Sequence, residues 1–337
     1  MPRPCAAPDA ASPWIDLRAT VHVHSEASRD SQGTLEEILG AARAVGTDVV
    51  VLADHNNRDQ APHEGWHGSV LLVVGEEKGG GDHILGIGHA GAISSRQTRP
   101  ELVRQLQEAG GVAFSAHPAG ESREDLAAEL EVVDGIEVYN LSTDIHDEGA
   151  IAIALKRVFG LTFLPRTTVR SVIDPPWEGL RLWDSALAAR PCVGIASVDA
   201  HGAHGLTYEL SFRVAQTHLL VSARTKAAVL DALRAGRCYM TFEIFSPVPY
   251  FTFEVHTPGA RLVMGSTGAW QPGTVARVVL PESARLCLRR DGEHLAEQEG
   301  KAFEFLLPSP GTYRVEAWRG DQLWIASNPV RLTEAVP

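Results

Sequence analysis

Thr20-Val21-His22-Val23-His24-Ser25 is the stretch from which the fold and the candidate site are best approached. It is β-branched and apolar apart from two histidines, which predicts a buried strand. Residues i and i+2 of a strand point to the same face, so His22 and His24 are expected to project side by side. Two imidazoles held in this way form half of a metal site. A His-x-His pair alone is also typical of surface histidines, so the metal interpretation requires His, Asp and Glu at the ends of other strands.

The whole-chain composition is that of a globular protein with acidic charge. The chain has 337 residues, of which 44% are hydrophobic and 21% charged, and its net charge is −12. This length predicts two domains, or one large domain with an appendage. Nucleic-acid-binding proteins usually carry a basic face, so the acidic balance argues against a nucleic-acid surface and suits a protein that binds divalent cations.

Cysteine spacing and hydropathy predict a cytoplasmic protein. Cys5, Cys192, Cys238 and Cys287 form no C-x-x-C pattern and are expected to be free thiols in a reducing compartment. Residues 1–13 are rich in Pro and Ala and lack the apolar core of a signal peptide. The sequence has no run of about 18 apolar residues, so no membrane span is predicted.

Strands alternate with helical segments from residue 17 to about residue 240. After the first strand, further strands are expected at residues 48–53, 70–74, 83–88, 111–115, 135–139 and 192–196. Continuous apolar strands separated by helices indicate a parallel sheet covered on both faces, and seven such units favour a barrel over an open sheet. In barrels the loops that follow the strands carry the chemistry. A long loop is predicted over residues 165–178, which contain Pro and Trp.

The pattern changes after about residue 240, where Pro, Gly and Thr rise and short strand-like runs predict an all-β sandwich. The predicted organisation is therefore a flexible N-terminus (1–16), an α/β barrel (17–245) and a small β-sandwich (246–337). Eleven of the 14 histidines lie at or before His204. The chemistry is accordingly expected in the first of the two folded parts.

The candidate ligands are histidines and carboxylates at or just beyond the strand ends. They are His22, His24, Asp30, Asp54, His55, Glu77 (or Glu76), His83, His117, Asp199 and His201. Imidazole with carboxylate suits Zn²⁺, Mn²⁺ or Fe²⁺, and the lack of cysteine argues against a structural zinc. The set exceeds one tetrahedral site, so two or three ions are expected to share it, and a carboxylate such as Glu77 can bridge two of them. Two metals about 3.5–4 Å apart can activate water and stabilise a leaving group.

The order of these motifs resembles the PHP (polymerase and histidinol phosphatase) family over about residues 17–245. The matching motifs are His22-x-His24, Asp54-His55-Asn56, Gly75-Glu76-Glu77, His83-Ile84-Leu85-Gly86, His117-Pro118 and Asp199-Ala200-His201-Gly202. The resemblance implies a distorted seven-stranded β/α barrel with two or three metal ions, and most characterised members hydrolyse phosphoesters. Residues 230–237, 311–317 and 327–329 are similar to the carbaryl-hydrolase-like branch, in which a β-sandwich follows the barrel.

Carried over residue by residue, the resemblance implies how the ions are held. One ion would be held by His22, His24, Glu77 and Asp199, and a second by His83 and His117 with Glu77 as the bridge. Asp30, His55 and His201 would complete the second site or build a third. Asp54 would support catalysis by orienting a ligand histidine. Trinuclear members usually carry His or Cys where this chain has Asn140, which favours a dinuclear site.

The leading function is a metal-dependent hydrolase of a small phosphate ester, in which His201 or a water gives a proton to the leaving oxygen. Asn140 is expected on the substrate side of the site, and Arg166 and Arg170 in the predicted loop could clamp a phosphate or carboxylate. Ordinary surface salt bridges explain the two arginines equally well. A carbamate or carboxylic ester hydrolase using the same site is the alternative enzyme. A metal- or glycan-binding barrel that has lost activity is the non-enzyme alternative. The sequence does not determine the oligomeric state.

Overall fold

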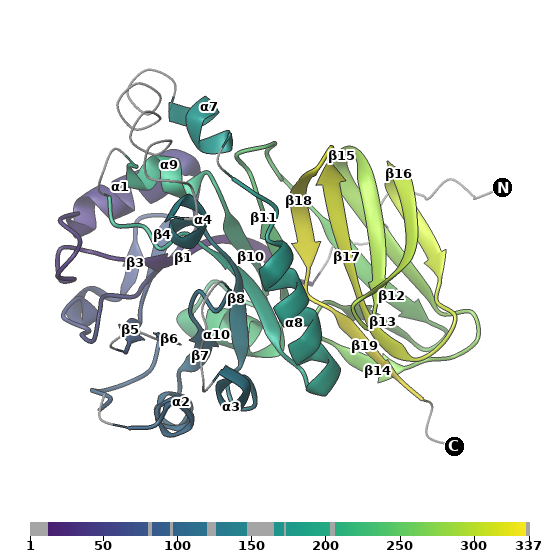
Figure 1. Ribbon diagram of the computed structural model, residues 1–337, viewed down its shortest axis with the longest axis horizontal. Coiled ribbons are helices and arrows are strands. Elements are labelled where there is room, and N and C mark those ends of the chain that lie inside the picture. Colours follow the sequence, from purple (N-terminus) through teal and green to yellow (C-terminus); the bar gives the residue numbers. More distant parts are fainter. Residues whose placement is uncertain are drawn as a thin grey trace.

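The computed structural model describes residues 13–79, 83–94, 97–119, 126–146, 165–171, 173–202 and 206–334, without the side chains of residues 145, 146, 165 and 166. Most of the predicted flexible N-terminus therefore lies outside the described residues. Figure 1 shows an α/β part, which contains the strands up to residue 241, beside an all-β part that begins at residue 252. No helix in these ranges is both long and apolar enough to cross a membrane.

The first sheet of the α/β part is built on the opening stretch. β1 (Ile15–Val23) pairs in parallel with β2 (Val49–Leu52), and β2 pairs in parallel with β4 (Val70–Val74). β2 and β4 are entirely apolar and entirely buried, as expected for parallel strands covered on both faces. On the other side, β1 pairs antiparallel with β10 (Gln216–Val221), which continues to β11 (Cys238–Thr241). β3 (Gly65–His67) forms the edge.

A second sheet holds the remaining strands of the α/β part. In order these are β5 (Glu76–Lys78), β6 (Ile84–Ile87), β7 (Val112–Ser115), β8 (Gly135–Asn140) and β9 (Val193–Ser197). β5, β6 and β7 are antiparallel neighbours, whereas β7, β8 and β9 are parallel.

The prediction of one closed seven-stranded barrel is wrong in detail, because these strands divide between two sheets. Among the residues described between β4 and β6, no helix separates these strands, so they lack the alternation that a β/α barrel requires. The division falls at Gly75, where an added Cβ would lie 2.2 Å from the carbonyl oxygen of Gly86. Two isolated bridges, Val23 with Ala200 and His55 with Glu77, connect the sheets beside candidate ligands.

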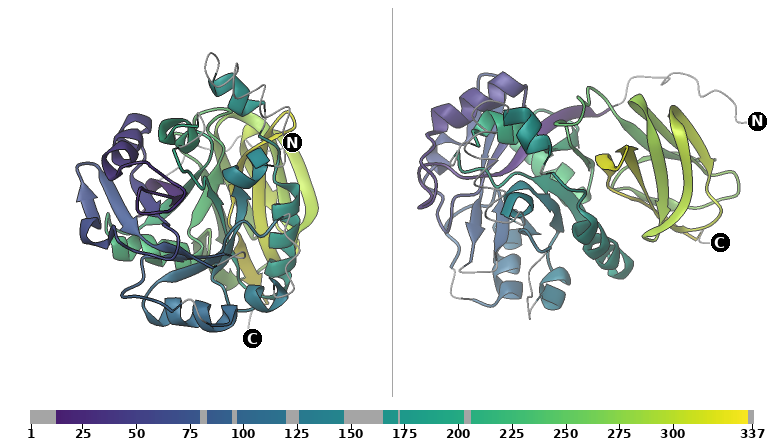
Figure 2. Two further views of the ribbon diagram at one scale, coloured as in Figure 1. Left: turned by 60° about the vertical axis from the view of Figure 1, so that its left-hand side comes forward. Right: turned by 45° about the horizontal axis from the view of Figure 1, so that its top comes forward.

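The main helices cover the outer faces of the sheets (Figures 1 and 2). They are α1 (Leu35–Val45), α2 (Arg99–Glu108), α8 (Trp177–Ala189) and α10 (Lys226–Ala235). Shorter helices are η1 (Ala61–His63), α3 (Leu126–Leu130), α4 (Leu141–His146), α7 (Pro165–Arg170) and α9 (Tyr208–Phe212). The predicted capping box of Thr34 and Glu37 opens α1. The predicted long loop over residues 165–178 is wrong over its first part, where α7 begins at a proline, a residue that the first helical turn accepts.

The C-terminal part is all β within the described residues, as predicted. Its strands are β12 (Thr252–Thr257), β13 (Ala260–Val263), β14 (Thr267–Ala269), β15 (Val275–Arg290), β16 (Glu293–Leu306), β17 (Gly311–Arg319), β18 (Gln322–Ser327) and β19 (Val330–Thr333). They bury a hydrophobic cluster of their own that includes Tyr313 and Trp324. However, β18 pairs with β11, so the first sheet runs on into this part. The strand pairing therefore does not show a separate sandwich. The domain boundary after residue 245 stays a prediction.

Buried polar contacts join the two parts. Arg314 on β17 forms a two-nitrogen contact with Asp184 on α8, at 2.7 and 2.8 Å. A separate network does not cross between the parts: His218 on β10 lies 3.0 Å from Asp16 on β1 and 3.5 Å from Glu243, which follows β11. Burial opposes the charging of His218, but the two carboxylates outweigh this effect and raise the pKa of His218 above its usual value.

Candidate metal centre

The candidate ligands come together at one end of the two sheets, because most of them lie at or next to the end of a strand. His22 is the second-last residue of β1 and His24 directly follows this strand. His55 follows β2, and Glu77 lies within β5. His83 precedes β6, His117 follows β7, and Asp199 and His201 follow β9. Residues from distant parts of the chain thus surround one point, as the sequence predicts.

The backbone is strained at three of these positions. His22, His117 and Asp199 have φ angles of 67°, 33° and 45°, in the left-handed region that L-residues rarely adopt. The pairing of β1 with β2 is also irregular between Thr20 and Val23. Such strain costs about 1–3 kcal/mol for each residue and concentrates at functional sites. The simple alternation expected for His22 and His24 is therefore broken, although their rings still lie 5.1 Å apart.

Glu77 is the centre of the cluster and is buried. Its two oxygens face different sets of histidines. Oε2 lies 3.2 Å from His22 Nε2, 3.5 Å from His24 Nε2 and 3.0 Å from His55 Nδ1, and Oε1 lies 2.7 Å from His83 Nδ1 and 3.0 Å from His117 Nε2. A carboxylate placed in this way can contribute one oxygen to each of two cations.

The neighbouring Glu76 points away from this centre. Its carboxylate pairs with Lys78 at 3.0 Å and with His89 at 3.2 Å. Alternation along β5 accounts for the difference, because successive side chains of a strand point to opposite faces. The sequence-based choice of Glu77 over Glu76 agrees with this geometry.

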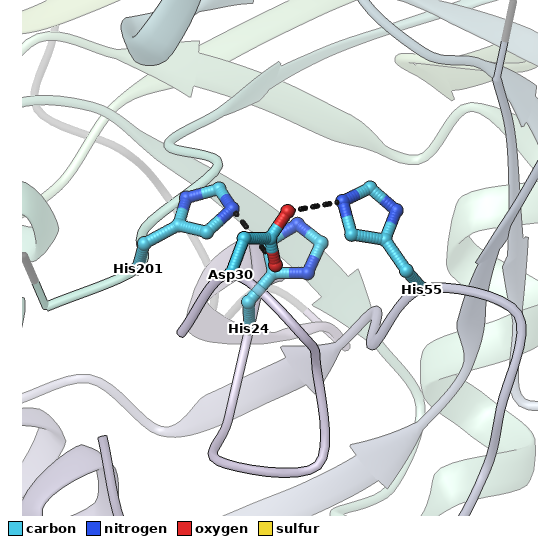
Figure 3. Close-up of side chains that lie close together, drawn as sticks. All are labelled: His24, Asp30, His55 and His201. Carbon is cyan, nitrogen blue, oxygen red and sulfur yellow. Dashed lines mark ion pairs between the residues drawn. The ribbon is translucent and has the colours of Figure 1, made fainter. Parts of the chain in front are cut away.

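Within this cluster, three groups of side chains can each place ligand atoms around a single point. The groups are His22, His24 and Asp199; His55, Glu77 and His83; and His24, Asp30, His55 and His201. In the first group Asp199 Oδ1 lies 3.0 Å from His24 Nε2 and 3.5 Å from His22 Nε2. In the third, drawn in Figure 3, Asp30 lies between two histidines, 2.9 Å from His55 Nε2 and 3.7 Å from His201 Nε2.

Glu137 on β8 supports the cluster from behind. Its Oε1 lies 2.7 Å from His22 Nδ1, and its Oε2 accepts hydrogen bonds from the backbone N–H of His117 at 2.8 Å and from Asn140 at 2.9 Å. A carboxylate on the far nitrogen of a metal-ligating histidine fixes the ring and its tautomer. Sequence reasoning missed Glu137, and its signal was an acidic residue inside an otherwise apolar strand.

The donor set fits a divalent cation. When Nδ1–H of His22 donates to Glu137, Nε2 carries a lone pair that faces the carboxylates of Glu77 and Asp199. This nitrogen is buried and has no hydrogen-bond partner among the described residues. Three acceptors converging on buried space need a positive charge between them, either a proton or a metal ion.

Without a metal ion, a proton on His22 would supply the positive charge between these carboxylates. Burial opposes a charge on His22, but Glu137, Asp199 and Glu77 raise its pKa well above the usual value. Burial likewise acts against ionised Glu77, yet His22 and the other histidines lower the pKa of Glu77 far below its normal range. Histidine ligands must be deprotonated to bind a metal, so loading of this site would release protons and become tighter as the pH rises.

His201 is held in a form suited to binding a cation. Its Nδ1 lies 2.9 Å from the backbone oxygen of Asp199, so Nδ1–H donates and the lone pair is on Nε2. Burial and the neighbouring His24 lower the pKa of His201. A neutral ring at neutral pH is a better ligand than general acid.

Three other predicted residues make contacts within the protein. Asp54 accepts hydrogen bonds from the backbone N–H and hydroxyl of Ser25, at 2.6 and 2.8 Å, so it holds the loop after His24 instead of touching a ligand ring. Asn140 donates to Glu137 and accepts from the backbone of Thr143. The guanidinium of Arg170 lies over the ring of Phe245. The side chain of Arg166 lies outside the described residues.

Comparison with known proteins supports the fold. No model of a known protein family matches the chain, and no curated protein does. Among solved structures, the chain is similar to a two-domain protein from Bacteroides vulgatus that contains a predicted PHP-like metal-dependent phosphoesterase. The identity is 13% and the TM-score 0.50, over 96% of this chain and 97% of that one.

Two further similarities are weaker. One is to a candidate metal-dependent phosphoesterase from Bifidobacterium adolescentis, with 16% identity, a TM-score of 0.37 and coverage of 55% of this chain and 87% of that chain. The other is to an amidohydrolase from Chromobacterium violaceum, with 14% identity, a TM-score of 0.32 and coverage of 54% and 87%. The likeness to the Bacteroides structure concerns the fold and extends over nearly the whole length of both chains. The carbaryl-hydrolase-like branch stays a prediction.

Proposed function

We propose that this protein is a metal-dependent hydrolase that acts on a small phosphate ester. The observation that carries the proposal is the position of Glu77, whose two oxygens each face a separate set of histidines. This arrangement provides two adjacent cation positions with one shared carboxylate. Such paired positions suit hydrolysis of a phosphoester.

The proposed ligand assignment rests on the contacts of the two Glu77 oxygens, and it differs from the groups described above in pairing His83 with His117. His22, His24 and Asp199 with Glu77 Oε2 would hold one ion, and His83 and His117 with Glu77 Oε1 would hold the second. The group of Asp30, His55 and His201 would complete the second site or hold a third ion. Mn²⁺, Fe²⁺ and Zn²⁺ all accept these ligands. When bound, the ions would supply a hydroxide nucleophile at neutral pH and stabilise charge on the phosphoryl oxygens.

A cavity beside the cluster would take the rest of the substrate. It has a volume of about 250 Å³ and is lined by His117, Asn140, Asp144, Trp177 and Arg181, among others. His117 belongs to both the cluster and the cavity wall, so an ester bound at the ions would place its leaving group there. Arg181 is exposed on α8 and offers a cation to a phosphate at the mouth.

Metal content is the first test. The purified chain is expected to hold two or three Mn, Fe or Zn ions, as measured by elemental analysis, and His22→Ala should lose at least one of them. His256→Ala, which changes a histidine on β12 of the C-terminal part, is the matched control and should keep them all. A metal-free protein whose stability does not respond to a chelator would overturn the proposal.

Substrate class is the second test. Hydrolysis of p-nitrophenyl phosphate, bis-p-nitrophenyl phosphate and 1-naphthyl carbamate should be compared on metal-loaded protein and on His22→Ala. We expect the phosphate esters to be cleaved and the activity to fall with metal content. Cleavage of the carbamate alone would replace the phosphoester proposal by the alternative hydrolase. Metal binding without cleavage of any of the three would favour the binding-protein alternative.

A further inference from the structure

A second cavity lies at the end of the sheet opposite to the metal cluster. Its volume is about 230 Å³. Its wall includes Asp134, directly before β8, and Val193, the first residue of β9. The candidate metal ligands follow the other ends of the strands, as Asp199 does after β9. The two sites are therefore separated by the length of the strands.

Three arginines from different parts of the chain line this second cavity. Arg190 follows α8, Arg234 lies in the last turn of α10, and Arg331 lies on β19 of the C-terminal part. The lining contains one carboxylate, Asp134, which is occupied by the backbone N–H of Ala113 at 2.8 Å and by a glutamine amide. The cavity therefore carries a net positive charge.

The arginines differ in what they can still donate. All three nitrogens of Arg190 donate to backbone carbonyls, so Arg190 has the fewest N–H groups left for a ligand. Arg331 uses one nitrogen, for the carbonyl of Leu187 at 3.2 Å, and Arg234 also uses one, for the carbonyls of Gly110 and Gly111. Arg234 and Arg331 thus retain most of their N–H donors, and guanidinium is the side-chain group best matched to phosphate and carboxylate oxygens.

Hydroxyl groups and a fixed loop complete the wall. Ser266 and Thr267 line the cavity, and neither hydroxyl has a hydrogen-bond partner within the described residues. Their loop is held against the end of α10 by Gly265, whose φ is 80° and where an added Cβ would lie 2.1 Å from the carbonyl oxygen of Ala235. A side chain at this position would push the loop away, so the glycine keeps the loop close to the end of α10.

We propose that this cavity binds a compact oxyanion, with inorganic phosphate as the ligand that best matches two guanidinium groups and two hydroxyls. Ligand pockets for larger molecules usually span about 300–1,000 Å³, so the volume here suits a small anion. The bound anion contacts α10 through Arg234 and β19 through Arg331. It therefore links the α/β part to the C-terminal part and stabilises their contact. The proposal does not depend on the hydrolase function.

Titration calorimetry of the full-length chain with inorganic phosphate tests the site. One binding event is expected in the parent chain and in His22→Ala, and its affinity should fall at least tenfold in Arg234→Gln and Arg331→Gln. Arg277→Gln, which removes an arginine on β15 from a pair with Glu304, is the matched control and should bind as the parent does. Malonate and sulfate, titrated in parallel, separate a phosphate site from a general oxyanion site.

The outcomes separate this site from the metal centre. Phosphate binding at the metal centre would add a second event that His22→Ala removes and the arginine variants retain. The proposal is overturned if the only phosphate binding observed is the event at the metal centre. It is also overturned if the event in the parent chain survives in both arginine variants. Arg331→Lys and Arg234→Lys keep the charge and should bind with intermediate affinity, which distinguishes loss of the anion contact from loss of folding. Phosphate should also raise the midpoint of thermal unfolding in the parent but not in Arg234→Gln.

Discussion

Glu137→Gln is the substitution that tests most directly how this fold aims a metal ligand. The carboxylate accepts three hydrogen bonds, from His22 Nδ1 at 2.7 Å, from the backbone of His117 at 2.8 Å and from Asn140 at 2.9 Å. A glutamine has one acceptor oxygen. If that oxygen serves His117 and Asn140, the new NH₂ group faces His22 Nδ1, and the ring must move its proton to Nε2. That proton then occupies the position of the metal ion, between His22 Nε2 and the carboxylates of Glu77 and Asp199.

The opposite orientation is no better, because the NH₂ group would then confront two donors, each left unsatisfied at a cost of about 1–3 kcal/mol. Loss of a carboxylate behind a ligand histidine typically weakens metal binding 10- to 100-fold, which corresponds to about 1.4–2.8 kcal/mol. We therefore expect this loss for the ion held by His22, as measured by competition with a chelator of known affinity.

The matched control for this prediction is Glu129→Gln. Glu129 is a buried glutamate on α3, and it pairs with Arg99 at 2.9 Å, away from the cluster. Its substitution should leave metal affinity unchanged. If Glu137→Gln stays folded by circular dichroism and binds metal within twofold of the parent, Glu137 does not position His22 and the tautomer argument fails.

Three further predictions test other parts of the structure. Glu77→Gln should reduce the metal content of the folded chain to near zero, whereas Glu76→Gln should retain it, and equal loss in both variants would contradict the orientation of β5. Gly75→Ala should lower the free energy of unfolding in urea by about 1–3 kcal/mol, because the new Cβ meets a carbonyl oxygen. Gly40→Ala in α1, where the Cβ meets open space, should raise this free energy by about 0.5–1 kcal/mol. Equal effects of the two substitutions would argue against close contact at Gly75. The pKa of His218 is raised in the folded chain, so its stabilising contribution is complete below about pH 6.5 and is lost as the pH rises through the folded pKa. The difference in urea midpoint between the parent and His218→Gln should therefore shrink between pH 6 and pH 9. A difference that stays constant over this range would refute the prediction.

The sequence predicted which histidines and carboxylates converge because these residues occupy positions with a local signature. A histidine or carboxylate that closely follows a largely apolar strand is conspicuous, and His55, His117 and Asp199 all do so. Glu137 has no such signature, since an acidic residue within a strand usually marks a solvent-facing position. Its role depends on His22, 115 residues away, and appears only once β1 and β8 lie in the same fold.

The sheet arrangement escaped prediction for a related reason. The apolar runs predict strands correctly, but the choice of neighbour depends on contacts between distant segments. The antiparallel β5–β6–β7 unit and the pairing of β11 with β18 are such contacts. Helix α7 is a different case. Its first residue, Pro165, favours a loop in the sequence pattern, but proline also occurs in the first turn of helices. These misses concern long-range pairing and an ambiguous residue, and they leave the position of the ligands at the strand ends unaffected.

The strained ligand positions show what the rest of the fold does for the site. Local preference opposes a left-handed backbone at His22, His117 and Asp199, so surrounding contacts must impose it. Around His22 these contacts are between the two sheets. The backbone N–H of His24 donates to the oxygen of Ala200 at 2.9 Å, and that of Ala200 donates to the oxygen of His22 at 3.2 Å. The hydrogen bonds that join the sheets are thus the ones that hold the ligands in an unfavourable conformation. Joining the sheets and aiming the ligands are consequently one structural event, and a chain that fails to bring Ala200 against β1 loses the metal centre even if every ligand residue is present.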